Sequence, residues 1–271
     1  MESRQSRASR LAEVWKPTLV YCMQTEAHVY ALSVAASVLL SVFPFLIVMM
    51  SLFRYGLQWR AGVHALELAL TDFFPGDMGV FITRNLASAV ENRGPFQITS
   101  AFLLMVTANG VFEPLEVALN RVWGVPKNRS YLRNQLVSLG LIFLCGGLAL
   151  VSFVLTALPR EMMFGWMPVP LGLLIFKIVA VPISILALWF MYWLLPNRKI
   201  PPAHVIPVSI LVGLAIELLK WINLLTWPLL KAKLQNEYGP FYISVTIVLW
   251  SFVAAMLILA GAEWTARRRP V

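Results

Sequence analysis

Three ionisable residues lie inside long apolar runs of the sequence. Lys177 falls in one run, and Glu217 and Lys220 fall in a later one. A charge near the centre of a bilayer costs roughly 2.5–3.5 kcal/mol on insertion scales, so such residues usually face the protein interior or a water-filled path. Glu217 and Lys220 are three residues apart and would share one face of a helix. We expect all three to meet in the outer half of the membrane, where two lysines and one carboxylate could bind an anionic group such as a lipid phosphate.

A packing role explains the same residues without a substrate. Glu217 would pair with one lysine inside the bundle, while the other lysine would extend along its apolar stem to the surface. A substrate path requires polar space beside Lys177 and Glu217, whereas a packing role requires a closed ion pair. The sequence is compatible with both interpretations.

A second polar group follows the second apolar run. Its members are Asn109, Glu113, Glu116 and Arg121. Residues Pro114 to Trp123 are predicted to form a short amphipathic helix that ends in a turn at Gly124 to Pro126. We expect the group to form a polar network at the cytoplasmic mouth of the bundle. It would anchor a loop or, as the alternative, contact a substrate.

Catalytic and metal-binding patterns of soluble proteins are absent from the sequence. His28, His64 and His204 lie in separate segments, with no spacing that would hold a metal. There is also no glycine-rich phosphate loop and no nucleophile elbow. Cys22 and Cys145 lie in different settings and predict neither a disulfide framework nor a metal site. We therefore expect no cofactor, no metal and no enzymatic activity.

The composition indicates a membrane protein. Hydrophobic residues make up 59% of the 271 residues and charged residues only 13%, with a mean hydropathy of +0.74. Soluble domains carry about 25% charged residues. Because about 20 helical residues cross a hydrocarbon core, the apolar runs predict one all-α membrane domain over residues 1–271, built as a bundle of six transmembrane helices. The predicted spans are 31–53, 96–112, 135–158, 169–195, 204–227 and 241–263.

The segments between the runs predict the orientation of the bundle. Lys and Arg are more numerous in the N-terminal segment 1–30, the loop 113–134, the 198–199 turn and the C-terminal end than on the opposite side. By the positive-inside rule this richer side is cytoplasmic, and both termini lie on it. Residues 60–93 place apolar residues at helical spacing around a Phe-Pro-Gly break. They predict a helical hairpin outside the bilayer, between the first two spans.

The net charge of +9 does not indicate nucleic-acid binding. The Lys and Arg residues flank the apolar runs rather than gather on one face, which is typical of topology signals and lipid headgroup contacts. Membrane lipids are therefore the expected partners. The polar N-terminus lacks the shape of a signal peptide, so we expect the first apolar run to remain as a membrane anchor.

Several short motifs resemble those of one protein family. They are Ser41-Val-Phe-Pro44, Phe74-Pro75, Ala118-Leu-Asn-Arg-Val-Trp-Gly124 with Arg129-Ser130, Tyr238-Gly239, and Gly261-Ala262-Glu263. Their order and spacing resemble the YihY/BrkB family of bacterial inner-membrane proteins. Trp264 and Pro240 depart from the family pattern. The family-motif residues that the resemblance marks are Ser41, Pro44, Asn120, Arg121, Gly239, Gly261 and Glu263.

The resemblance implies a six-span protein of the inner membrane with cytoplasmic termini, associated with envelope integrity and serum resistance. The family has also carried a ribonuclease label. The residues give that label no support, because phosphodiester hydrolysis calls for metal-binding carboxylates or a positioned acid and base. We expect a transporter or flippase-like protein for a lipid or another amphiphilic anion. The alternative is a non-transporting scaffold that binds envelope proteins through the outer hairpin or the basic loop.

Overall fold

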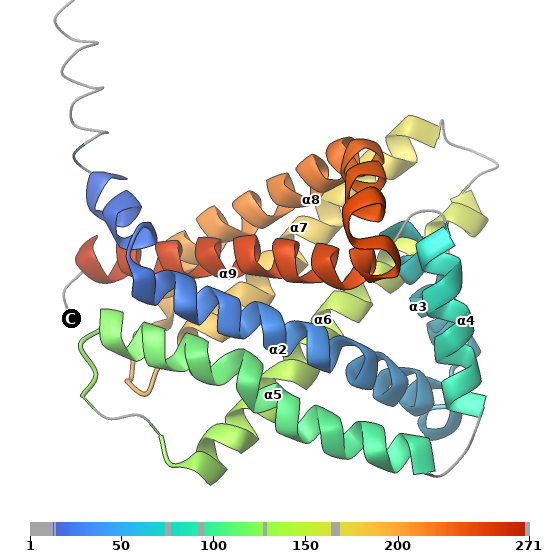
Figure 1. The fold of residues 1–271 in the computed structure, drawn as a ribbon, viewed down its shortest axis with the longest axis horizontal. Helices are drawn as coiled ribbons and strands as arrows, with labels where there is room; N and C mark the ends of the chain where they lie inside the picture. The colour runs from blue at the N-terminus through green and yellow to red at the C-terminus, as the bar shows by residue number, and fades with distance from the viewer. Residues whose placement is uncertain are drawn as a thin grey trace, which may run out of the picture.

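Every regular element in the described part of the chain is a helix (Figure 1). The computed structural model describes residues 13, 15–73, 77–91, 95–126, 129–163 and 169–268. Residues 15–22 are helical. The following elements are α2 (Thr25–Ser51), the π-helical turn η1 (Leu52–Gly56), α3 (Arg60–Phe73), α4 (Asp77–Glu91), α5 (Pro95–Val122), α6 (Tyr131–Met163), α7 (Val169–Leu194), α8 (Pro202–Tyr238), the 3₁₀ turn η2 (Gly239–Phe241) and α9 (Tyr242–Arg268). The all-α class predicted from the sequence is confirmed.

Several helices are suited to cross a membrane. Three helical stretches in the described residues are long and apolar enough to do so, namely Thr25–Gly56, Pro202–Asn223 and Leu225–Arg267. Shorter apolar helices cover Leu132–Leu148 and Val181–Leu194. A helix bonds its backbone polar groups internally, which hydrocarbon requires of any segment exposed to it.

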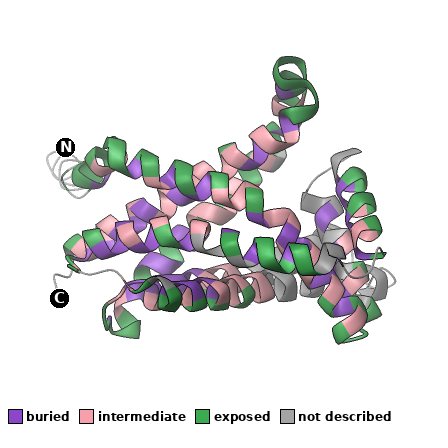
Figure 2. Cartoon of the chain, turned by 60° about the horizontal axis from the view of Figure 1, so that its bottom comes forward, coloured by how far each residue is buried: buried purple, intermediate pink, exposed green. Residues whose placement is uncertain are grey.

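The long helices pack as a bundle. α2 packs against α5 and α9, α6 packs against α7, and α8 packs against both α7 and α9. Figure 1 shows α2, α5 and α9 running along the molecule, with α3 and α4 standing across one end. Buried residues lie where helices face one another, and exposed residues follow the outward faces (Figure 2). Large apolar side chains on those faces, among them Leu40, Phe102 and Leu225, suit contact with lipid tails.

Two clusters of buried apolar residues stabilise the bundle. The larger cluster joins α2 and α5 to α6, α7, α8 and α9, and includes Leu119, Tyr192 and Leu259. The smaller cluster joins the end of α2 to α3 and α4, and includes Met50 and Leu66. The end of α8 and the start of α9 also contribute to the smaller cluster. The helices α3 and α4, which lie within the predicted 60–93 hairpin, are therefore packed on the bundle.

The turn η1 directs the chain from α2 into α3. The Leu57 N–H donates to the Leu52 carbonyl at 2.8 Å, which is the i to i+5 bond of a π-helix. Arg54 of η1 pairs with Glu91 at 3.3 Å, which joins this turn to the end of α4. The Phe74-Pro75 motif, which would lie between α3 and α4, falls outside the described residues.

The structure differs most from the sequence-based prediction at the ends of two helices, α5 and α8. α5 runs unbroken to Val122, so no separate helix begins at Pro114 and the predicted 113–134 loop starts as helix. α8 continues past the predicted end at residue 227 and contains Pro228. A helix in a bundle tolerates proline when packing offsets the lost backbone hydrogen bond. The chain turns after these helices at Gly124 and Gly239, whose φ angles of 65° and 52° disfavour residues with a Cβ.

Candidate functional site

Glu217 and Lys220 of α8 meet Ser184 of α7 in a polar cluster. Lys220 Nζ lies 2.6 Å from Glu217 Oε1. The Ser184 hydroxyl donates to the same oxygen at 2.7 Å, and Lys220 Nζ lies 3.5 Å from Ser184 Oγ. The three-residue spacing therefore gives an ion pair across one helical turn, and a hydroxyl from the neighbouring helix completes it. Sequence reasoning missed Ser184 because small hydroxyl residues are common wherever membrane helices pack.

The cluster lies partway along both helices. Ser184 precedes Leu194, the last residue of α7, by ten positions, and Glu217 follows Pro202, the first residue of α8, by fifteen. At about 1.5 Å per residue these separations are roughly 15 and 22 Å. A hydrocarbon core is about 30 Å thick. The cluster therefore lies well inside both helices rather than at these helix ends.

The cluster opens toward the outer surface of the bundle. The Lys220 side chain is 40% exposed and that of Glu217 is 17% exposed. Leu214 and Trp221 lie three and four residues from Glu217 on the same side of α8, and both are exposed. The ion pair thus borders the apolar outward face of α8 rather than the buried core.

The charges of the pair balance, but its hydrogen-bonding capacity is not used up. An ammonium group has three donors, and Lys220 has two acceptors in this cluster, Glu217 and Ser184. Lys220 can therefore also donate to an anionic group at the exposed side, while Ser184 continues to donate to Glu217. Lys177 precedes Ser184 by seven residues in α7. The Lys177 side chain lies outside the described residues, so its predicted meeting with Glu217 and Lys220 stays a prediction.

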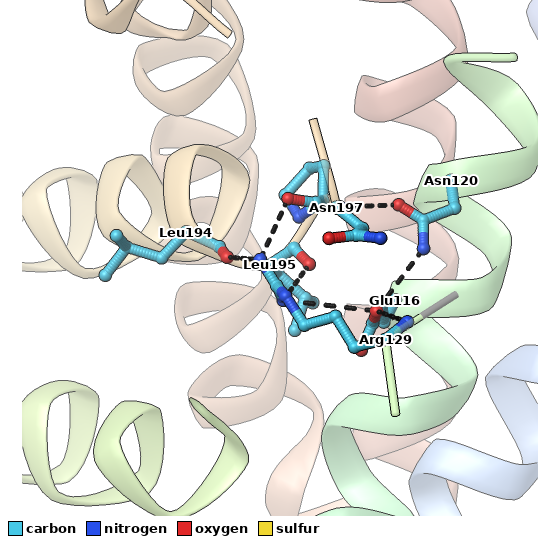
Figure 3. A network of polar contacts seen from close by, with 7 residues as sticks. Glu116, Asn120, Arg129, Leu194, Leu195 and Asn197 are labelled. Carbon is cyan, nitrogen blue, oxygen red and sulfur yellow. Dashed lines mark hydrogen bonds and ion pairs between the residues drawn. The ribbon is translucent and has the colours of Figure 1, made fainter. Parts of the chain in front are cut away.

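A second polar network forms where α5 and α7 end. Arg129, which follows α5, donates from Nη1 to the Leu195 carbonyl at 2.7 Å (Figure 3). Its Nη2 donates to the carbonyls of Leu194 at 2.8 Å and Pro196 at 3.0 Å. The last carbonyls of a helix lack partners within the helix and carry partial negative charge. The guanidinium therefore caps α7. Burial lowers the pKa of Arg129 and the nearby Glu116 carboxylate opposes this effect, so the side chain stays charged at neutral pH.

Glu116 and Asn120 of α5 complete the network (Figure 3). Glu116 Oε1 accepts from the Arg129 backbone N–H at 3.3 Å and from Asn120 Nδ2 at 3.4 Å, and lies 4.0 Å from Arg129 Nη1. Asn120 Oδ1 accepts from the Asn197 N–H at 2.7 Å. Glu116 and Asn120 are each 1% exposed. These bonds tie α5, the segment that follows it and the α7–α8 turn to one another.

The four residues of the predicted network do not all meet. Glu116 lies in the buried network, whereas Arg121 is exposed and pairs with Glu26 of α2 at 2.6 Å. Residues five apart on a helix face different sides, while Glu116 and Asn120 are four apart and share one. Glu113 is exposed, and the side chain of Asn109 lies outside the described residues.

Comparison with known proteins places the chain in a family. Residues 21–270 match the family described as virulence factor BrkB. The chain belongs to this family. Three BrkB-family relatives, each named UPF0761 membrane protein, come from Chlorobium chlorochromatii, Acinetobacter baylyi and Pseudoalteromonas translucida. They are 26%, 26% and 24% identical to this chain over 239, 203 and 263 residues.

The relatives differ in length from this chain. The matches cover 86%, 73% and 93% of it, and 54%, 48% and 84% of the respective relatives. The chain therefore spans about half the length of the first two. No solved structure matches the chain. Together with its apolar helices, the match to relatives named membrane proteins identifies a membrane protein.

The BrkB-family motif residues occupy several separate places. Asn120 lies in the Arg129 network and Arg121 outside it, and Gly239 ends α8. Ser41 is buried in α2, where its hydroxyl donates to the Val38 carbonyl at 3.2 Å, and Pro44 lies inside the same helix. Gly261 lies at the contact of α7, α8 and α9, and Glu263 joins α9 to the N-terminal helix.

No three His, Cys, Asp or Glu side chains gather as a metal-ligand set among the residues that the structure describes. The prediction that the chain uses no metal or cofactor stays a prediction.

Proposed function

We propose that this BrkB-family protein is a transporter or flippase-like protein for a lipid or another amphiphilic anion in the bacterial inner membrane. The observation that carries the proposal is the cluster of Ser184, Glu217 and Lys220, in which the lysine side chain is 40% exposed partway along apolar helices. A lysine at this position can bind the anionic headgroup of such a substrate.

The exposure of Lys220 supports a substrate path beside the ion pair. A charged residue facing hydrocarbon costs roughly 2.5–3.5 kcal/mol, and the cost falls when water or a polar headgroup reaches the charge. The ion pair of Glu217 and Lys220 is closed at 2.6 Å, as a packing role also requires, and what supports a substrate path is that Lys220 borders the outward face of α8. An amphiphile suits this site because its headgroup can contact the polar cluster between α7 and α8 while its tails remain in the bilayer.

We further propose that α2 and α5 to α9 each cross the membrane, with both termini in the cytoplasm and α3 and α4 outside. Arg129 and Arg198 lie near the ends of α5 and α7, and Arg267 lies near the end of α9. α3 and α4 stand at the opposite end of the bundle (Figure 1). The concentration of cations at one end supports this orientation by the positive-inside rule.

Cysteine labelling tests the orientation. The background carries Cys22→Ser and Cys145→Ser, which remove both native thiols. Single cysteines replace Arg84, which is exposed on α4, or Lys199, which is exposed between α7 and α8. We expect a membrane-impermeant maleimide to label position 84 in right-side-out spheroplasts and to label position 199 only after permeabilisation. Labelling of position 199 in intact spheroplasts would contradict the proposed topology.

Reconstitution tests transport. We expect the purified protein in liposomes to move a fluorescent phosphatidylglycerol between leaflets faster than a phosphatidylcholine analogue, as measured by dithionite quenching. Lys220→Met is expected to slow this movement about tenfold or more. A hydrogen bond to a charged group contributes about 1.5–3 kcal/mol, and 1.4 kcal/mol corresponds to a factor of ten. Glu217→Gln, which alters the partner of Lys220, is expected to slow it as well.

The matched control is Thr226→Val. Thr226 is an exposed polar residue on the same helix whose hydroxyl donates to its own backbone at Ile222 at 2.7 Å. This variant is expected to transport at the wild-type rate. Wild-type rates of lipid movement in both Lys220→Met and Glu217→Gln, at equal reconstituted amounts, would contradict the proposed role of the cluster.

A scaffold that binds envelope proteins is the second candidate. Val80 and Phe81 of α4 are exposed on a hairpin that we place outside the membrane, and such side chains suit a protein partner. The same liposomes separate the two candidates because they contain this chain alone. Lipid movement in them cannot arise from a scaffold that acts through a partner.

A further inference from the structure

The short N-terminal helix, residues 15–22, presents an apolar arc away from the bundle. Leu19 and Val20 are exposed on it, and Met23 follows in the turn. The exposed fractions of Leu19 and Met23 are 62% and 81%, which are high for such side chains. At 3.6 residues per turn these positions fall on one side of the helix. The arc therefore forms one continuous apolar surface.

The opposite side of this helix is fixed to α9. Thr18 is 4% exposed, and its hydroxyl donates to Glu263 Oε2 at 2.5 Å and accepts from Arg267 Nη2 at 2.8 Å. Arg267 also pairs with Glu263 at 3.2 Å. The rings of Trp15 and Trp264 stack with their centroids 6.2 Å apart. These contacts determine which way the helix faces, so the outward direction of the arc is a property of the fold.

Exposed apolar residues also follow the arc in α2. Val29 and Leu32, early in α2, are exposed and follow Met23 within three turns. Lys16 is exposed one turn before Leu19 and Val20 on the same side of the helix, and Arg267 lies across the helix. In the sequence, Arg4, Arg7 and Arg10 precede the helix, against Glu2 and Glu13 as the acidic residues of residues 1–15. Apolar side chains bordered by an excess of cations are the pattern of helices that lie in an anionic headgroup layer.

We propose that residues 15–23 form an interfacial anchor, which lies in the anionic headgroup layer of the leaflet at which α2 begins and α9 ends. Thr18 and Glu263 are its positioning residues, because they turn the apolar arc toward lipid. The family-motif residue Glu263 thereby gains a role that is separate from the α7–α8 cluster. The anchor does not depend on transport activity.

Spin-label accessibility tests the anchor. Labels are placed at Leu19→Cys or Met23→Cys in the Cys22→Ser, Cys145→Ser background, and the protein is reconstituted in nanodiscs that contain phosphatidylglycerol. The control label replaces Lys199, an exposed residue between α7 and α8. We expect the ratio of collisions with oxygen to collisions with a water-soluble nickel chelate to be severalfold higher at positions 19 and 23 than at position 199. In nanodiscs of phosphatidylcholine alone, the ratio at 19 and 23 should fall toward the control value.

Three outcomes would overturn the proposal. Nickel-accessible labels at 19 and 23 would place the arc in water, and dipolar broadening between labels would place it against a second copy of the chain. Ratios that are equal in the two lipids would remove the assignment to an anionic layer. As a test of positioning, Thr18→Val removes the bond to Glu263 without changing any charge, and should mobilise the label at position 23.

Discussion

The Arg129→Met variant is expected to lose about 3–5 kcal/mol of its free energy of unfolding. The substitution removes three hydrogen bonds to the end of α7. It also leaves Glu116, which is 1% exposed, without its nearby cation. Removing one partner of a buried pair is costly because the other charge stays in a medium that solvates it poorly. Steric trapping of the purified protein in bicelles measures this free energy.

Arg133→Met is the matched control for Arg129. Arg133 is an exposed arginine one turn further along the chain, so its loss should change the free energy of unfolding by no more than about 0.5 kcal/mol. The double variant Glu116→Gln with Arg129→Met should lose less than the sum of the single losses, since no unpaired buried charge remains. A loss below about 1 kcal/mol for Arg129→Met would contradict the capping role, because one ordinary hydrogen bond accounts for that much.

The part of the candidate site that depends on local spacing was predictable. Glu217 and Lys220 share a helical face in any α-helix, so their contact follows from the sequence alone. Ser184 is 33 residues from Glu217 and reaches it only because α7 and α8 pack at this position. Which partner a buried charge finds on another helix depends on helix rotation, and one sequence does not encode that rotation in any local pattern.

The Arg129 network was even less predictable from the sequence. Arg129 bonds to carbonyls 65 to 67 residues away, and backbone carbonyls carry no side-chain signature. The family motif did mark Asn120, and Asn120 lies in this network. Arg121, its neighbour in the motif, instead joins α5 to α2 through Glu26. A polar motif at a helix end can thus serve two different contacts, because adjacent residues point about 100° apart.

The fold itself was predictable where hydrophobic length determines it. The all-α class and the apolar helices follow from runs that are too long and too apolar for water. Helix ends were less predictable, since Pro114 and Pro228 lie inside α5 and α8. The turn η1 also had no sequence signal, because a π-helical turn inserts one residue without a characteristic composition.

The two polar regions differ in how they are built. Glu116 and Asn120 are sealed from the surroundings, and their bonds join three chain segments. Ser184, Glu217 and Lys220 sit on a single seam and keep one exposed edge. A sealed network suits rigidity, whereas an open one suits exchange of partners. This contrast supports a rigid bundle end near Arg129 and a binding site at the contact between α7 and α8.

Gly261→Ala is expected to lower the free energy of unfolding by about 1–3 kcal/mol, and Gly261→Val by more. A Cβ at this position would lie 2.4 Å from Val212 Cγ2, 2.9 Å from Val208 Cγ2 and 2.8 Å from the Tyr192 hydroxyl oxygen. The Tyr192 hydroxyl donates to the Ile258 carbonyl at 2.6 Å, so it cannot move without breaking that bond. The close approach of α7, α8 and α9 therefore depends on the missing side chain.

Gly140→Ala is a control that is expected to change the free energy of unfolding in the opposite direction. A Cβ at Gly140 of α6 would meet nothing within 4 Å, so the substitution adds a methyl group in open space. Alanine favours a helix over glycine by roughly 0.5–1 kcal/mol, so this variant should match or exceed wild-type stability. Equal stability of Gly261→Ala and Gly140→Ala would mean that α9 can shift away from α7 and α8 at little cost. The contact between α7 and α8 that positions the polar cluster would then depend less on α9 than the packing at Gly261 indicates.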